Sequence, residues 1–193
     1  MQIVIATNNY DKTLEFKHML GPRSAQIIPQ EQLQVPEISE TGLTFVENAI
    51  LKARNACQYT NMPAIADDSG LEVDALAGSP GIYSARYAGP KAPYTDNIAK
   101  LLQELHDIPE PRRTARFQCV LVLLKSATDP APIICQGTWE GRITFSPEGA
   151  NGFGYDPIFW VPTHKCTAAQ LPTELKNKIS HRAQALNKIM CYI

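Results

Sequence analysis

Two adjacent carboxylates, Asp67 and Asp68, stand between the apolar run 64–66 and the dipeptide Ser69-Gly70. We expect 64–66 to form a short buried strand, so both carboxylates would lie where the backbone leaves a sheet, a common place for ligands in open sheets. Carboxylate oxygens there suit Mg²⁺, which proteins hold through one or two carboxylates together with substrate phosphates. The alternative is a capped turn, because these residues are common turn formers.

Polar residues from Thr7 to Lys12 connect an expected strand at 3–6 with an expected helix that runs to Leu20. Hydroxyl, amide and ammonium groups beside a helix N-terminus favour anions such as phosphate. The segment lacks glycine and is not a Walker loop. An ordinary strand-to-helix turn, with its kink at Asn8 and Asn9, is the alternative.

The segment 151–157 places Phe153 and Tyr155 among glycines. Such aromatics can stack on a flat base, or they can fill the core. Further along, His181 and Arg182 follow Ser180 at an expected helix start, where their donors could read the carbonyl oxygen of a purine, as arginine reads a guanine edge. The alternative for these two residues is a solvated surface pair.

One helix is expected to combine a core face with a polar face. Thr44 and Glu47 have the spacing of a capping box at its start. Asn48, Lys52 and Asn55 recur at helical spacing on the polar face, opposite a stripe of small and apolar residues. Lys52 is therefore either a solvated helix lysine or a second contact for phosphate.

Hydrophobic periodicity and chain breakers predict a mixed α/β class, with both crossover and hairpin connections. The remaining expected strands are 25–28, 115–125, 133–139 and 158–161, of which 115–125 is central and 133–139 is its hairpin partner. The remaining expected helices are 44–59, one capped by Thr95 or Asp96, and a final one capped by Ser180, and 78–89 is an ordered loop.

Composition excludes several classes of protein. A hydrophobic share of 44% and a charged share of 19% in 193 residues describe a folded chain with a full core. Eighteen basic against 19 acidic residues give a net charge of −1, which supplies no positive field for polymeric DNA or RNA. The apolar run Cys119–Leu124 is far too short to cross a bilayer, and residues 1–10 carry no secretory signal, so we expect a cytoplasmic protein without a membrane segment.

The five cysteines are odd in number, widely spaced and without a Cys-x-x-Cys pair. This pattern argues against a disulfide framework and against a zinc site. We expect reduced thiols that pack as small hydrophobes.

Taken together and in this order, six stretches make the sequence resemble the inosine triphosphate pyrophosphatase family, which removes non-standard purine nucleotides. Each stretch alone would be weak, but they span nearly the whole chain at the family's spacing. The stretches are Thr7-Asn8-Asn9-Tyr10-Asp11-Lys12, Glu40-Thr41-Gly42-Leu43-Thr44-Phe45-Val46-Glu47-Asn48-Ala49, Ala66-Asp67-Asp68-Ser69-Gly70-Leu71, Pro80-Gly81-Ile82-Tyr83-Ser84-Ala85-Arg86-Tyr87, Gly152-Phe153-Gly154-Tyr155-Asp156-Pro157-Ile158-Phe159 and Ser180-His181-Arg182.

The resemblance implies one domain over residues 1–193, with an elongated mixed sheet flanked by helices and two lobes around an active-site cleft. It implies a homodimer that hydrolyses ITP, dITP and XTP to the monophosphate and pyrophosphate with Mg²⁺. Such an activity cleanses the nucleotide pool of bases that would otherwise enter DNA and RNA.

The resemblance also implies residue roles. Asp68 would be the proton acceptor and a metal ligand, and Ser69 a substrate contact. A 6-oxo purine satisfies donors that the amine of adenine would leave unpaired, so adenine should be rejected strongly. The triphosphate would be cradled by Thr7, Asn8, Asn9, Tyr10, Asp11, Lys12 and Lys52, and the base would be held by Phe153, Gly154, Tyr155, Asp156, Lys176, His181 and Arg182.

The sequence departs from the family pattern in two places. Asn8 and Asp11 stand where the family has glycines, and because both tolerate left-handed backbone angles we expect the loop to keep its shape. Ser39 stands where the family has a metal-ligating glutamate, so either Glu40 or a water would supply the second ligand beside Asp68, and metal affinity would be lower.

Two alternatives to this hydrolase stay open. One is a nucleotide-binding sensor without efficient turnover, which the presence of Ser39 motivates. The other is a pyrophosphatase for different modified nucleotides, such as methylated pyrimidines.

Overall fold

Every residue of the first strand is hydrophobic, and successive side chains point into two separate hydrophobic cores. The computed structural model describes residues 2–21 and 27–193. In β1 (Ile3–Ala6), Ile3 and Ile5 enter one core while Val4 and Ala6 enter the other, as the two-residue period of a strand requires. A strand buried on both faces must be covered by helices on both sides.

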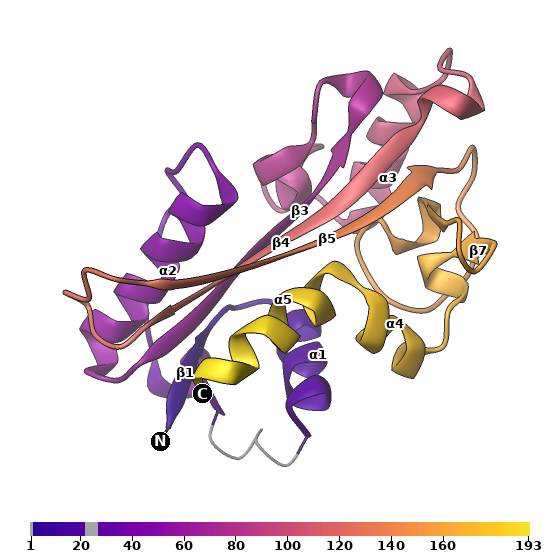
Figure 1. Cartoon of the computed structure of the whole chain (residues 1–193). Coiled ribbons are helices and arrows are strands. Elements are labelled where there is room, and N and C mark those ends of the chain that lie inside the picture. Colours follow the sequence, from indigo (N-terminus) through magenta and orange to yellow (C-terminus); the bar gives the residue numbers. More distant parts are fainter. Residues whose placement is uncertain (1, 22–26) are drawn as a thin grey trace. The chain divides into compact units, whose positions relative to one another are not determined.

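The strands of the described residues form one mixed sheet in the order β2-β1-β3-β4-β5-β6-β7. Figure 1 labels β1, β3, β4, β5 and β7. β1 is parallel to β2 (Ile27–Pro29) and to β3 (Ala64–Val73), with Ile5 opposite Ile65. β6 (Phe159–Val161) is antiparallel to β5 (Ile133–Ile143) and to β7 (Cys166–Thr167). β4 (Thr114–Leu124) holds the central place, so the predicted mixed α/β class and central strand are confirmed.

The chain divides into two compact units, and each unit draws on separate stretches of sequence. The first unit comprises Met1–Asp68, Cys119–Gly137 and Arg182–Ile193, and the second comprises Ser69–Gln118 and Thr138–His181. Strands β3, β4 and β5 contribute residues to both units.

In the first unit, helices serve the two cores separately. α1 (Tyr10–Leu20) and α5 (His181–Ile189) pack on the core that contains Ile5 and Ile65. α2 (Phe45–Thr60) packs its small residues on the other core, which contains Val4. Residues 64–68 of β3 therefore face α1 and α5 or face α2 in alternation.

In the second unit, the aromatic side chains of Phe117, Trp139 and Phe159 form the centre of the core. α3 (Tyr94–Glu104) and α4 (Thr173–Ile179) pack against it. The glycine-rich loop after β5 contains Gly149, Gly152 and Gly154, all with positive φ. The expected ordered loop at 78–89 contains a 3-10 helix at Gly81–Arg86.

Most predicted elements are confirmed, and α2 begins as its capping box predicts. The Thr44 hydroxyl accepts the backbone N–H of Glu47 at 3.3 Å, and the Glu47 carboxylate accepts the N–H of Leu43 at 2.8 Å. The predicted cap of α3 is wrong, because Pro93 precedes the helix and no side chain caps it. The prediction that Asn48 lies on a polar surface is also wrong, because Asn48 is fully buried.

Three further predictions concern the start of β2, the cysteines and membrane crossing. The strand expected at 25–28 begins at Ile27 in the structure, and Pro22 and residues 25 and 26 lie outside the described residues. None of the five cysteines, all of which lie in described residues, forms a disulfide. Those at 57, 119 and 135 are buried as expected, whereas Cys191 is exposed. Across the described residues, no helix combines the length and the apolar character that a membrane crossing needs.

Candidate active site

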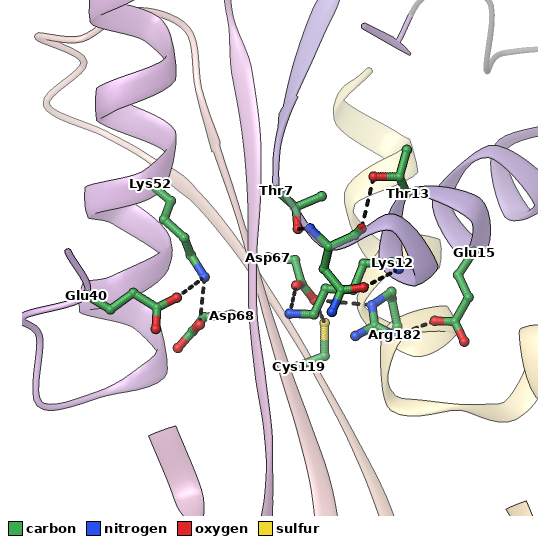
Figure 2. Close-up of polar contacts among 11 residues, drawn as sticks. Thr7, Lys12, Thr13, Glu15, Glu40, Lys52, Asp67, Asp68, Cys119 and Arg182 are labelled. Carbon is green, nitrogen blue, oxygen red and sulfur yellow. Dashed lines mark hydrogen bonds and ion pairs between the residues drawn. The ribbon is translucent and has the colours of Figure 1, made fainter. Parts of the chain in front are cut away.

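Asp67 and Asp68 lie inside strand β3, and the prediction that they follow the end of a short strand is wrong. The strand continues from Ala64 to Val73 through the sequence Asp-Asp-Ser-Gly. Because consecutive strand residues point to opposite faces, Asp67 points toward α1 and Arg182 while Asp68 points toward Lys52 on α2 (Figure 2). Cationic partners on both faces stabilise residues that would otherwise favour a turn.

Asp68 belongs to a group that we call the Lys52 cluster, formed by Glu40, Lys52 and Asp68. Lys52 Nζ donates to Asp68 Oδ1 at 2.7 Å and to Glu40 Oε1 at 2.9 Å. Burial opposes protonation of Lys52, but the carboxylates of Asp68 and Glu40 outweigh it and raise the pKa of the ammonium. Burial also raises the pKa of Asp68, and Lys52 only partly offsets this effect.

The second oxygen of Asp68 is the feature of this cluster that fits a cation. Asp68 Oδ2 is buried and receives no hydrogen bond from any described residue. No set of three or more His, Cys, Asp or Glu side chains in the described part of the chain is arranged to hold a metal. Asp68, through its buried Oδ2, and Glu40 are carboxylates of the kind that hold Mg²⁺ together with substrate phosphates and water.

Asp67 belongs to a separate group, the Asp67 cluster, formed by Lys12, Glu15, Asp67, Cys119 and Arg182 (Figure 2). The Asp67 carboxylate pairs with Lys12, accepts from Arg182 Nε at 3.2 Å and accepts from Cys119 Sγ at 3.4 Å. Arg182 also pairs with Glu15. Every side chain here except Lys12 and Glu15 is almost fully buried.

The charges within the Asp67 cluster fix its ionisation. Burial alone would raise the pKa of Asp67, but Lys12 and Arg182 outweigh it and hold that pKa well below its usual range. Burial would likewise lower the pKa of Arg182, but Asp67 and Glu15 raise it. At neutral pH Asp67 and Arg182 are therefore both charged and paired with each other.

The segment from Thr7 to Lys12 is ordered by its own side chains. Asn9 is the N-cap of α1, and its side chain accepts the N–H of Lys12 at 3.0 Å. Thr7 Oγ1 accepts the N–H of Asn9 at 3.2 Å, and Asn8 Oδ1 accepts from Gln30 at 2.6 Å. The segment is therefore a capped helix start, with Lys12 in the first turn.

Two residues of this segment depart from what the sequence suggested. Asp11 lies in the first turn of α1 rather than in a loop, and neither Asn8 nor Asp11 has a positive φ. Neither residue uses the left-handed angles that it tolerates, and Asp11 is helical because α1 already starts at Tyr10. The Tyr10 side chain is 72% exposed.

In the second unit, Asp156 connects the residues predicted to hold the base. Lys176 Nζ pairs with Asp156 Oδ2 at 2.5 Å, and the backbone N–H of Phe153 donates to the same oxygen at 2.9 Å. Lys176 Nζ also lies 4.9 Å from the centre of the Phe153 ring. Of the two aromatics, Phe153 is half-buried, whereas Tyr155 is buried and donates its hydroxyl proton to Ser84 O at 2.8 Å.

His181 lies in the aromatic core of the second unit rather than on a solvated surface. Its ring stacks on Phe117 with centroids 4.8 Å apart, and it lies 6.4 Å from Trp139. The solvated alternative is wrong for Arg182 as well, because both side chains are buried. Ser69, the first residue of the second unit, is partly buried in β3.

Comparison with known proteins assigns the chain to a family. The sequence model described as the Ham1 family matches residues 3–192. The chain belongs to the Ham1 family. This result confirms the resemblance predicted from the sequence.

Relatives of this Ham1 chain align over nearly their whole length. A dITP/XTP pyrophosphatase of Shewanella oneidensis is 57% identical, with 98% of this chain and 92% of the relative covered, and one of Vibrio cholerae is 54% identical, with 97% and 94% covered. The solved structure of a HAM1 protein from Coxiella burnetii matches with a TM-score of 0.91 and 49% identity, covering 100% of this chain and 98% of that one. These matches confirm two predictions: the mixed α/β fold class, and that the chain is an enzyme of the hydrolase class.

Sequence reasoning missed part of the site in this Ham1 chain. It offered Asp67 only as one of two carboxylates suited to Mg²⁺, expected Cys119 to pack as a small hydrophobe and gave Glu15 no role. In the structure, Asp67 contacts Lys12 and Arg182, Glu15 contacts Arg182, and Cys119 contacts Asp67. Glu15 stands three residues after Lys12 on α1 and shares its helix face, so its position was a usable signal. Nothing local to Cys119 indicates that its thiol reaches a carboxylate 52 residues away.

Proposed function

We propose that this chain hydrolyses the non-standard purine nucleotides ITP, dITP and XTP to the monophosphate and pyrophosphate, and so cleanses the nucleotide pool. The observation that carries the proposal is Asp68, which lies in the Lys52 cluster with one buried oxygen that no described residue hydrogen-bonds. The similarity to curated dITP/XTP pyrophosphatases supports the choice of substrate.

Asp68 is the proposed proton acceptor. Water attacks the α-phosphorus, its proton passes to an Asp68 carboxylate oxygen, and pyrophosphate leaves. The raised pKa of Asp68, which burial causes, makes this carboxylate a stronger base than an exposed aspartate. Lys52 donates to Asp68 Oδ1 at 2.7 Å and so fixes the orientation of the carboxylate.

Asp68 and Glu40 are the residues that would hold Mg²⁺. When bound, the ion would supply positive charge to the phosphate oxygens as negative charge develops on them. Glu40 shares Lys52 with Asp68, which brings the two carboxylates near each other and supports Glu40 as the second ligand in spite of Ser39.

The remaining predicted roles are proposed unit by unit. In the first unit, Thr7, Asn8, Asn9, Tyr10, Asp11, Lys12 and Lys52 would contact the triphosphate, and the capped N-terminus of α1 supports this role because its amides favour anions. In the second unit, Phe153, Gly154, Asp156, Lys176 and His181 are proposed to hold the base. Tyr155 supports that loop from the core, and Arg182 and Ser69 complete the proposed contacts.

The test is pyrophosphate release from dITP, XTP, dGTP and dATP at fixed enzyme concentration, with Mg²⁺ or with EDTA. The proposal requires Mg²⁺-dependent release from dITP and XTP and little from dATP or dGTP. No release from any nucleotide, with dITP still bound, would instead indicate a nucleotide sensor. Faster release from methylated pyrimidine nucleotides would indicate the other alternative.

We further propose that the protein is a cytoplasmic homodimer that binds no polymeric nucleic acid. The near-zero net charge supports the last point. Light scattering coupled to size exclusion tests the dimer, and a monomeric mass at micromolar concentration would contradict it.

A further inference from the structure

Asn48 is a buried polar residue that the chemistry described above does not use. It lies in the first turn of α2 and has no exposed surface. Asparagine is a poor residue inside a helix, because its side chain competes for backbone hydrogen bonds. Its side-chain Nδ2 is buried without a hydrogen-bond acceptor among the described residues. A residue kept at this position against both costs calls for a specific explanation.

The other end of the Asn48 side chain reaches the loop that carries Glu40. Asn48 Oδ1 accepts the backbone N–H of Gly42 at 2.8 Å. The next amide, that of Leu43, is bound by the Glu47 carboxylate at 2.8 Å. Two consecutive amides of the loop are therefore fixed to the first turn of α2.

Gly42 is fitted to this contact by its lack of a side chain. A Cβ at Gly42 would lie 2.7 Å from Asn48 Oδ1 and 2.6 Å from the Glu47 Cβ. Both distances are shorter than real Cβ contacts allow, so any larger residue must displace the loop or the helix. The glycine is required by this close approach, since its φ is not in the left-handed region.

The Gly42 anchor acts on Glu40 because only one residue separates them. Glu40 Oε1 contacts Lys52 at 2.9 Å, and Lys52 stands one helical turn after Asn48 on the same face of α2. Helix α2 thus carries both Asn48, which fixes the loop, and Lys52, which pairs with Glu40 of that loop.

We propose that Asn48 is a positioning residue that sets the place of Glu40 as a metal ligand through its hydrogen bond to the Gly42 amide. The proposal rests on the proposed function in assigning Glu40 to Mg²⁺. Removing a residue that orients a metal ligand, without itself binding the metal, commonly weakens metal affinity by tenfold or more.

The test compares Asn48→Ala with Asn48→Asp, which keeps an acceptor oxygen for Gly42, and with Asn55→Ala as a control. Asn55 is on the same helix and donates to Pro36 O at 2.8 Å, at the far end of the same loop. Three quantities are measured: amide hydrogen exchange over residues 37–44, Mn²⁺ binding by electron paramagnetic resonance, and the Mg²⁺ concentration at half-maximal dITP hydrolysis.

For Asn48→Ala we expect faster exchange at Gly42, and both Mn²⁺ affinity and apparent Mg²⁺ affinity weakened by about tenfold. Asn48→Asp should restore metal binding to within about threefold of wild type, and Asn55→Ala should leave it unchanged. Faster exchange with unchanged metal binding in Asn48→Ala would overturn the proposal, and so would equal losses in Asn48→Ala and Asn55→Ala.

Two arrangements keep the test decisive. If Asn48→Ala does not fold, Gly42→Ala takes its place, because its Cβ must displace the same contact. If the wild-type protein hydrolyses no nucleotide, the proposed function fails on its own, while exchange and Mn²⁺ binding still decide the role of Asn48.

Discussion

Asp67 and Asp68 are neighbours in β3, yet their carboxylates lie on opposite faces of the strand and their pKa values shift in opposite directions. Burial disfavours the charge of both. For Asp67, Lys12 and Arg182 outweigh burial and lower its pKa, whereas for Asp68 burial prevails over Lys52 and raises its pKa. The strand thus places a structural carboxylate beside one suited to accept a proton.

Replacing Asp67 with asparagine should destabilise the protein by about 3 kcal/mol, because it leaves the buried Arg182 and the partly buried Lys12 without their shared carboxylate. Urea unfolding at pH 7 measures this change. The effect should shrink as the pH falls: the lowered pKa of Asp67 gives stability above its unfolded pKa, and this is lost as the pH approaches the folded value. A loss below about 1 kcal/mol at pH 7 would contradict the pairing.

Replacing Asp68 with asparagine should instead reduce activity without reducing stability. Because the folded pKa of Asp68 is raised above its unfolded value, ionising Asp68 costs more free energy in the folded protein than in the unfolded chain. Asp68→Asn, which leaves Glu40 as a partner for Lys52, should therefore preserve or increase stability. Pyrophosphate release from dITP should fall by about 10²–10⁴-fold, while dITP binding by calorimetry persists. Retained activity would remove Asp68 from its proposed role.

Gly152 and Gly154 offer a matched pair of substitutions in the second unit. Both have positive φ, so alanine at either costs about 1–2 kcal/mol in backbone strain. A Cβ at Gly152 would also collide with the Asp156 carboxylate, whereas one at Gly154 meets nothing within 4 Å. Gly152→Ala should therefore lower thermal stability clearly more than Gly154→Ala, and it should raise KM for dITP more. Equal effects would mean that the contact with Asp156 contributes nothing.

Glu47→Gln should destabilise the start of α2 in a pH-dependent manner. Hydrogen bonds from Thr44 and from the Leu43 amide lower the pKa of Glu47, so its carboxylate stabilises the folded state above the unfolded pKa of about 4.3. The difference in Tm between wild type and variant should be largest at pH 6–7 and should shrink below pH 4. A difference independent of pH would show that the charge of Glu47 is not involved.

Features encoded within a few residues were predictable from the sequence. The start of α2 depends on Thr44 and Glu47, which stand three residues apart, so their spacing sufficed. The central place of β4 followed from its unbroken apolar run. The cap of α3 was predicted wrongly because Thr95 and Asp96 are typical N-cap residues. In the structure the helix already begins at Tyr94, so Pro93 occupies the N-cap position.

The extent of β3 and the Asp67 cluster were not predictable in this way. Local propensity favours a turn at Asp-Asp-Ser-Gly, and distant cations override it. Lys12, Lys52 and Arg182 come from three different helices, and no local spacing connects them with β3. The resemblance implies that Arg182 contacts the base, but it does not indicate that Arg182 also forms an ion pair with Asp67.

The pair of Asp67 and Arg182 joins residues 115 positions apart, and this fixes an order of events during synthesis. A ribosome that adds 5–20 residues per second takes on the order of ten seconds to travel from one to the other. Every residue of the second unit, Ser69–Gln118 and Thr138–His181, is made within that interval. The whole second unit is therefore synthesised while Asp67, translated before it, has no Arg182 with which to pair.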